Sequence, residues 1–133
     1  GQLQLIDDRV SSRRDIFDRY KKALSHISGF SFMEEADYGR TNRWLTTLTV
    51  DEKEAGVSRS QIIDALDKEN IESRPVWKPM HMQHLYKNYK YVKVGEKDIA
   101  RNLFENGLCL PSGSSLLKVD QDRIVDIIQS LVK

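Results

Sequence analysis

The sequence has few features that would place the chain outside the ordinary globular proteins. Its only cysteine, Cys109, excludes an internal disulfide framework, and we expect a reducing compartment, the cytoplasm. No apolar run approaches the roughly 18 residues needed to span a bilayer, so we expect no membrane association. The first ten residues lack the basic start and apolar centre of a signal peptide. With 21 Lys and Arg side chains against 20 Asp and Glu, bulk electrostatic capture of nucleic acid is also disfavoured.

The composition that remains fits a single domain covering residues 1–133. This length lies within the usual range of about 100–150 residues for a domain, and a chain of this size can bury a hydrophobic core without disulfide or metal crosslinks. The chain shows no internal repeat, low-complexity tract or linker. It begins at Gly1 rather than at a methionine, which fits a processed or truncated product of a larger protein.

Hydrophobic periodicity predicts four helices, which cover residues 2–28, 58–70, 98–106 and 120–131. The first carries apolar side chains at spacings of three, four and seven, and we expect Gly29 to end it. Ser58 and Gln61 have the spacing of a capping box, which marks the start of the second helix. Asp120 is the expected N-cap of the last helix.

Short runs of β-branched, aromatic and other apolar residues predict four strands, at 30–33, 44–50, 71–76 and 108–111. Residues 51–57 read as a turn, and residues 80–96 as a helical turn near 81–86 followed by an irregular loop. The resulting order of elements indicates the α/β (α+β) class. We expect a small, mostly antiparallel sheet packed by helices.

Three groups of residues could in principle bind a metal or act as nucleophiles, but a purely structural role explains each of them more simply. His81 and His84 are three residues apart, but no further ligand stands near them to complete a metal shell. Cys109 lies between two leucines in a predicted buried strand, where a thiol is normally inert. The serine-rich loop at 112–115 lacks the frame of a nucleophile elbow and the lysine of a phosphate loop, so we expect a plain turn.

The segment YKNYKYVKVGEK, at 86–97, interleaves tyrosines with lysines. Aromatic rings can stack on bases and lysines can meet phosphates, so single-stranded nucleic acid is one interpretation. The balanced overall charge and the absence of a known nucleic-acid-binding pattern favour an exposed loop or a subunit contact. We therefore expect no nucleic-acid partner.

The segment ESRPVWKPMH, at 72–81, presents Arg74, Trp77, Lys78 and His81 on a backbone that two prolines make rigid. Cations, an indole face and an imidazole in fixed positions would suit an anionic ligand with a flat ring. A structural proline-rich corner with Trp77 in the core explains the same residues equally well.

The segments RRDIFDRYKKAL, TNRWLTTLTV, NIESRPVWKPMHMQ and LFENGLCLPSGSSL, followed by DQDRIVDII, occur in this order along nearly the whole chain. With them the sequence resembles the C-terminal small domain of the DegT/DnrJ/EryC1/StrS sugar aminotransferases, in the branch that serves bacillosamine, pilin glycosylation and exopolysaccharide. The most specific parts are ESRPVWKPMHMQ and GLCLPSGS. The resemblance implies the aspartate-aminotransferase fold, fold type I of the enzymes that use pyridoxal phosphate (PLP).

The resemblance also implies a function. Enzymes of this family are homodimers that transfer an amino group, usually from glutamate, to a keto carbon of a nucleotide-linked sugar. Their catalytic lysine and PLP-binding residues belong to a large N-terminal domain, which would precede Gly1. We expect this chain alone to be inactive and to hold no PLP covalently. The alternative is a free-standing ligand-binding or regulatory module of the same fold.

The resemblance assigns a substrate-binding role to His81, with Trp77, Lys78 and Arg74 as weaker neighbours. Asn42 and Arg43 match a further family loop and complete the expected substrate-binding residues. No residue of this chain is expected to be catalytic, to bind a metal or to bind the cofactor.

Overall fold

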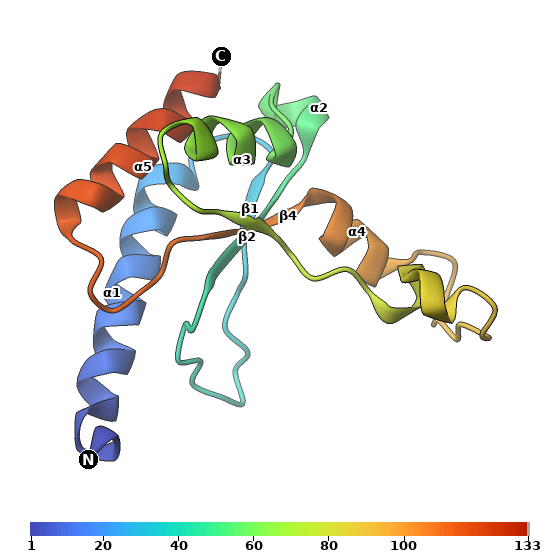
Figure 1. The fold of residues 1–133 in the computed structure, drawn as a ribbon, viewed down its shortest axis with the longest axis horizontal. Helices are drawn as coiled ribbons and strands as arrows, with labels where there is room; N and C mark the ends of the chain where they lie inside the picture. The colour runs from blue at the N-terminus through green and yellow to red at the C-terminus, as the bar shows by residue number, and fades with distance from the viewer. Residues whose placement is uncertain (133) are drawn as a thin grey trace.

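A computed structural model describes residues 1–132 and shows a small sheet with helices on one side and a long extension on the other (Figure 1). The 3-10 helices are labelled η. The elements in chain order are η1 (Gln2–Leu5), α1 (Ile6–Leu24), β1 (Phe30–Phe32), β2 (Thr46–Val50), α2 (Glu52–Ala55), α3 (Arg59–Lys68), β3 (Arg74–Pro75), η2 (Met80–Met82), η3 (His84–Tyr86), α4 (Ile99–Asn106), β4 (Gly107–Leu110) and α5 (Lys118–Leu131).

The four strands form one antiparallel sheet in the order β1-β2-β4-β3. Leu48 of β2 lies opposite Phe32 of β1 and Leu108 of β4, and all three side chains are buried. Because successive strand residues point to opposite faces, this row and its neighbours form one apolar face. The mixed α/β class and the antiparallel sheet predicted from the sequence are therefore confirmed.

The apolar face of the sheet is covered by α1, α3 and α5, which lie together on one side of the molecule (Figure 1). The α1 stripe buries Phe17, Tyr20 and Leu24 against the sheet. Burial raises the pKa of the Tyr20 phenol, whose hydroxyl donates to the Pro111 carbonyl oxygen at 3.1 Å. Gln121 of α5 donates to the carbonyl of Ile16 at 2.7 Å and so joins the two helices.

One predicted helix cap and one further predicted helix are confirmed. Ser58 and Gln61 form the predicted capping box at the start of α3, where the Ser58 backbone N–H donates to the Gln61 side chain at 2.8 Å. The predicted helix over 98–106 is also present, with the Asp98 carboxylate accepting from the Arg101 backbone N–H at 3.0 Å.

Gly29 does not end the first helix, because α1 already ends at Leu24 and the chain then turns to bring Ile27 into the core. Gly29 serves a close approach instead. Its φ is +81°, and a Cβ atom there would stand 2.7 Å from the Asp51 carbonyl oxygen and 2.9 Å from the Ala55 nitrogen. Only glycine fits this position without strain.

Other boundaries also differ from the predictions; for example, the strand expected at 44–50 begins only at Thr46, and the second helix ends at Lys68. The last helix begins at Lys118, two residues before the expected cap Asp120; its N-cap is Leu117, which makes no side-chain capping hydrogen bond. The expected turn at 51–57 contains the short helix α2, capped by the Asp51 side chain. The predicted strand at 71–76 pairs only over Arg74–Pro75, which lie opposite Cys109 and Leu108 of β4.

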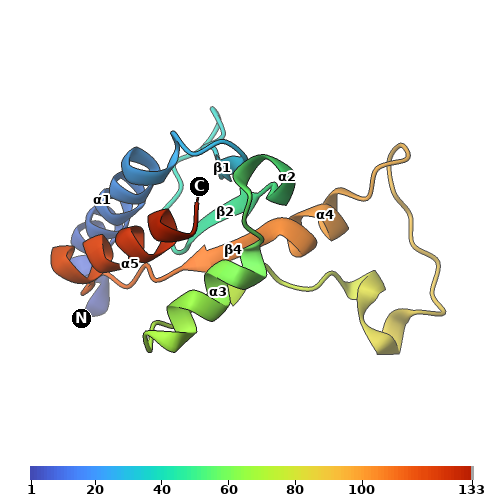
Figure 2. The ribbon, with the colours of Figure 1, turned by 90° about the horizontal axis from the view of Figure 1, so that it is seen from above.

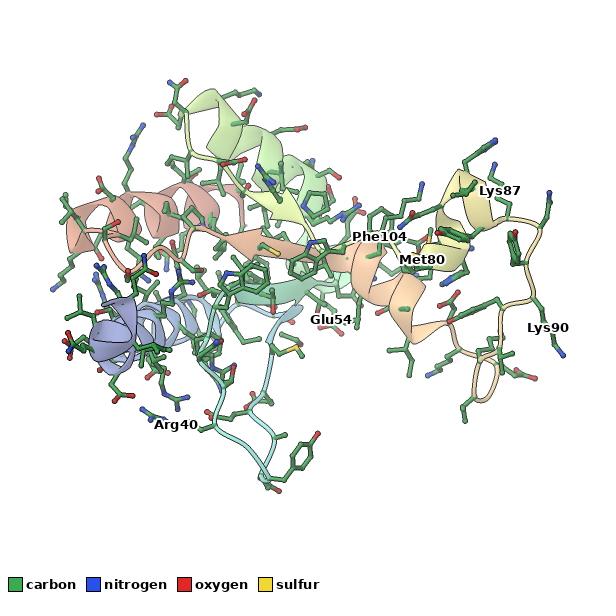
Figure 3. The ribbon with its side chains drawn as sticks, turned by 60° about the horizontal axis from the view of Figure 1, so that its bottom comes forward. Arg40, Glu54, Met80, Lys87, Lys90 and Phe104 are labelled. Carbon is green, nitrogen blue, oxygen red and sulfur yellow. The ribbon has the colours of Figure 1, made fainter. Side chains whose placement is uncertain are left out.

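Between β3 and α4 the chain leaves the sheet and returns as an extension of residues 77–98, which we call the arm (Figure 2). The arm holds η2, η3 and a loop, so the helical turn predicted near 81–86 is confirmed in 3-10 form. Lys87 and Lys90 lie toward its outer end (Figure 3). No helix within residues 1–132 has the length and apolar content needed to cross a membrane.

Candidate functional site

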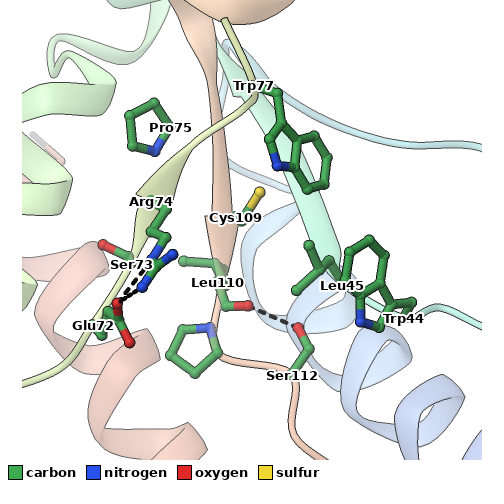
Figure 4. A pocket seen from close by; sticks show the side chains of 11 residues that line it. Trp44, Leu45, Glu72, Ser73, Arg74, Pro75, Trp77, Cys109, Leu110 and Ser112 are labelled. Atoms are coloured by element: carbon green, nitrogen blue, oxygen red, sulfur yellow. Dashed lines mark hydrogen bonds and ion pairs between the residues drawn. The ribbon is translucent and has the colours of Figure 1, made fainter.

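A pocket of about 520 Å³ opens beside the base of the arm (Figure 4). Leu45, which directly precedes β2, and Cys109 of β4 contribute to it. Its most prominent members are Trp44 and Trp77, whose rings are stacked with centroids 5.9 Å apart and planes 18° apart. Trp77 is 61% exposed and Trp44 is 59% exposed. The alternative that placed Trp77 in the core is therefore wrong.

Trp44 is held in place by the loop between β1 and β2. The Asn42 side-chain oxygen accepts from the Trp44 backbone N–H at 3.0 Å, and Arg13 of α1 donates to the Trp44 carbonyl. Arg14 makes a bidentate ion pair with Glu35, with nitrogen–oxygen distances of 2.9 and 3.1 Å. The Arg14 guanidinium, aided by the Thr41 backbone N–H, lowers the pKa of the Glu35 carboxyl to about 2. Asn42 thus orients an aromatic wall of the pocket.

Arg43 is buried inside the same loop. Its guanidinium lies 3.6 Å from the centroid of the Phe17 ring and donates to the Met33 carbonyl at 2.7 Å, with Glu35 at 3.8 Å. Its backbone adopts a φ of +48°, a left-handed conformation that is uncommon for residues other than glycine. The structure therefore places Arg43 beneath the loop, where it fixes the backbone on which Trp44 stands.

The two basic residues predicted near Trp77 are both exposed. Arg74 lines the pocket from the edge strand β3 and pairs with Glu72 (Figure 4). Lys78 follows Trp77 at the base of the arm, and its backbone carbonyl accepts from the Gln83 side chain at 3.3 Å. The pocket thus combines indole faces with a cation at its rim.

His81 lies further along the arm in a second group with Asp98 and Tyr91. Its Nε2 is 2.9 Å from Oδ2 of Asp98, and its ring stacks on Tyr91 with centroids 3.7 Å apart and planes 13° apart. The Tyr91 hydroxyl donates to the other Asp98 oxygen at 3.2 Å. We call these three residues the arm cluster.

Of the predicted site residues, Arg74 and Trp77 share the pocket, Asn42 and Arg43 support it, and Lys78 connects it to His81 in the arm cluster. Their roles in substrate binding stay predictions. Sequence reasoning missed Trp44, Tyr91 and Asp98. Asp98 carried a local signal as a helix boundary, but nothing in the sequence pointed it toward a histidine 17 residues earlier.

The groups that the sequence favoured as structural occupy structural positions. Ser112 accepts from the Thr46 backbone N–H at 2.8 Å and donates to the Leu110 carbonyl at 2.8 Å, so its hydroxyl ties β2 to the end of β4. The Cys109 thiol is buried, and burial raises its pKa. Residues 1–132 contain no group of three or more His, Cys, Asp or Glu side chains that could hold a metal ion.

None of the lysines that the structure describes fits a covalent PLP site. A Schiff-base lysine has to be held against the cofactor in a protected pocket. The lysines within residues 1–132 are exposed, apart from Lys21, which is half-buried and paired with Glu34 at 3.0 Å. Within residues 1–132 no lysine is enclosed by this chain, and the place where the cofactor is held stays a prediction.

Comparisons with known proteins point to one family. The family model described as the DegT/DnrJ/EryC1/StrS aminotransferase family matches residues 1–129. EpsN of Bacillus subtilis (strain 168), whose name places it among the pyridoxal phosphate-dependent aminotransferases, is 44% identical over 98% of this chain and 33% of its own length. A GDP-perosamine synthase of Caulobacter vibrioides is 28% identical over 99% of this chain and 35% of its own length.

Solved structures give the same result for the fold. A DegT DnrJ EryC1 StrS aminotransferase from Brucella abortus superimposes with a TM-score of 0.81 at 26% identity, over 98% of this chain and 33% of that one. The chain thus spans about a third of the length of the relatives it matches. The predicted fold, that of PLP fold type I, is confirmed.

Proposed function

This chain belongs to the DegT/DnrJ/EryC1/StrS aminotransferase family, and on that premise we propose that it is the C-terminal small domain of a sugar aminotransferase. The complete enzyme transfers an amino group, from glutamate, to a keto carbon of a nucleotide-linked sugar in glycan or polysaccharide biosynthesis. A large N-terminal domain supplies the PLP-binding residues, and the enzyme acts as a homodimer in the cytoplasm. The alignment of 98% of this chain with only a third of its relatives carries this proposal.

The surface at the base of the arm supports substrate binding as the task of this domain. A nucleotide-linked sugar combines a flat base with a diphosphate that carries about two negative charges. Trp44 and Trp77 offer exposed indole faces, and Arg74, Lys78 and His81 offer cationic or hydrogen-bonding groups on the same segment. In the proposed enzyme this domain recognises and orients the sugar nucleotide.

The division of labour follows from the side chains present. When bound to its large domain, PLP supplies the electron sink for amino transfer. The residues of this chain bind the substrate and cover the site, and the loop anchored by the buried Arg43 side chain holds Trp44 in place for that purpose. The chain alone is therefore expected to bind no PLP covalently.

The test replaces His81 in the polypeptide that joins this chain to its PLP-binding domain. Loss of a hydrogen bond to a charged group costs about 1.5–3 kcal/mol, so His81→Ala should raise the KM for the sugar nucleotide about tenfold or more. The KM for glutamate should change much less. His84→Ala, which removes an exposed histidine three residues away, is the matched control. Equal effects on both substrates would contradict the assigned role.

A spectroscopic test addresses the division between domains. Mixing PLP with the 133-residue chain should give no Schiff-base absorbance and no borohydride-reducible adduct at a specific lysine. A specific adduct would overturn the proposal that the cofactor belongs to another domain. A gene in which a start codon directly precedes this stretch would favour the free-standing module instead.

A further inference from the structure

The arm cluster closes the arm upon itself. His81 belongs to the outgoing leg and Asp98 to the returning leg, and their 2.9 Å contact joins residues 17 positions apart. The two side chains are only 14% and 18% exposed, although the loop between them lies open to solvent. Tyr91 covers the imidazole from one face at 3.7 Å. A polar pair so well shielded, in a segment without a fully buried side chain, calls for a reason beyond folding.

The partners of Asp98 settle which atom of the histidine donates. The Asp98 carboxylate accepts from the Arg101 backbone N–H at 3.0 Å and lies 3.6 Å from the Arg101 guanidinium. The Arg101 backbone bond, helped by His81 and Tyr91, lowers the pKa of Asp98. An ionised carboxylate can only accept hydrogen bonds, so Nε2 of His81 must carry the proton that points at Asp98.

The other ring nitrogen of His81 is left for a ligand. No hydrogen bond joins Nδ1 to any group within residues 1–132. With Nε2 fixed as a donor, a neutral ring presents Nδ1 as an acceptor, whereas a charged ring presents it as a second donor. An anionic phosphate oxygen requires the donor. The Asp98 carboxylate then supplies the counter-charge that a shielded imidazolium needs.

We infer that Asp98 is a positioning residue, which fixes the ring of His81 so that Nδ1 alone faces the diphosphate of the substrate. Tyr91 supports it by holding the ring plane from behind. This inference rests on the proposed function, because it assumes that His81 contacts the sugar nucleotide. It adds to that function a specific atom, a specific partner and a chemical class of contact.

The test must separate this role from the capping of α4, since Asp98 performs both. Asp98→Ser keeps a good N-cap residue, but its short side chain cannot hold the imidazole. Tyr91→Phe keeps the stacked ring and loses only the hydroxyl contact to Asp98. Together the two variants separate helix stability from the orientation of His81.

Nuclear magnetic resonance of the ¹⁵N-labelled 133-residue chain reports on the histidine directly. The wild type should show an Nε2–H proton of His81 protected from exchange with water, and ring protons shifted upfield by Tyr91. Asp98→Ser should lose the protected proton, while the melting temperature stays within a few degrees of wild type. Tyr91→Phe should keep both signals. Equal His81 signals in the wild type and Asp98→Ser would overturn the inference.

Kinetics of the complete enzyme provide the second readout. Asp98→Ser should raise the KM for the sugar nucleotide several-fold, approaching the effect of His81→Ala, and should change the KM for glutamate little. If His81→Ala raises that KM but Asp98→Ser does not, the positioning role fails while the proposed function stands. If His81→Ala has no effect, the substrate-binding role itself fails, and the positioning role with it.

Discussion

The core beneath the sheet and the arm beyond it are held together by different means. The core joins α1, α3 and α5 to the sheet through buried apolar side chains such as Leu66 and Leu108. The arm has no fully buried side chain, and its two legs are linked by the polar cluster of His81, Tyr91 and Asp98. Apolar packing sets the free energy of unfolding, whereas the arm cluster sets the position of the His81 ring, which we propose to contact the substrate.

If the arm recognises the substrate as we propose, stability and ligand recognition can be changed separately. The loop at 33–45 is intermediate between the two regions, because an ion pair to α1 and a buried guanidinium fasten it to the core. Substitutions in these three regions should therefore have graded effects on the free energy of unfolding.

The largest effect is expected in the core. Leu66 of α3 is completely buried, so Leu66→Ala should lower the free energy of unfolding by about 2–5 kcal/mol, through lost burial and the cavity left behind. Leu85→Ala provides the control, because Leu85 lies in the arm and is 75% exposed. It should change stability by less than about 0.5 kcal/mol. Urea denaturation measures the free energy of unfolding of both variants. Similar losses in the two would contradict the view that the core, and not the arm, determines stability.

A smaller effect is expected where the core needs a special backbone. Gly29→Ala would force a side chain into a left-handed conformation against α2, and we expect a loss of about 1–3 kcal/mol. Gly39→Ala tests the same change in the loop at 33–45, where φ is not positive and nothing lies within 4 Å of the added atom. That variant should be neutral or slightly stabilising. If Gly29→Ala left stability unchanged, the backbone at Gly29 would not be packed tightly against α2.

The smallest effect concerns Glu35, and it depends on pH. The pKa of Glu35 is lowered to about 2 in the folded chain, from an ordinary value of 4.5. The ion pair with Arg14 therefore stabilises the fold fully above the ordinary value, and this contribution is lost as the pH falls through about 2. Glu35→Gln should make stability less dependent on pH between 5 and 2.

Glu34→Gln removes the same charge from the neighbouring position, where the carboxylate is more exposed and pairs with Lys21. Denaturation curves collected over this pH range compare the two variants. An identical pH dependence in the wild type and in Glu35→Gln would show that the ion pair does not fasten the loop.

Local signals in the sequence predicted the class of the fold and most of its elements. The spacing of Ser58 and Gln61 located a helix start, since a capping box depends only on neighbours in the chain. Gly29 misled the prediction, because the glycine serves a contact with α2 more than 20 residues away. Where tertiary packing determines the end of a helix, the residues next to it in the sequence do not predict that end.

For the candidate site too, local sequence signals identified some residues, whereas only the fold reveals the others. Trp77 and Lys78 were identified because two prolines and an unusual composition mark their segment. The stacking of Trp44 on Trp77 and the contact of Asp98 with His81 join distant segments without any periodicity. Such pairs follow from the path of the arm and the β1–β2 loop, which no spacing rule predicts.

The shortness of β3 also bears on how copies of this chain meet in a crowded solution. An outer strand normally offers a row of free N–H and C=O groups, on which a neighbouring molecule can build a continuous intermolecular sheet. Here the outer strand beside β4 is only Arg74–Pro75, and the proline ring nitrogen has no hydrogen to donate. The rigid corner that presents Trp77 therefore also blocks fibre-like growth from that margin.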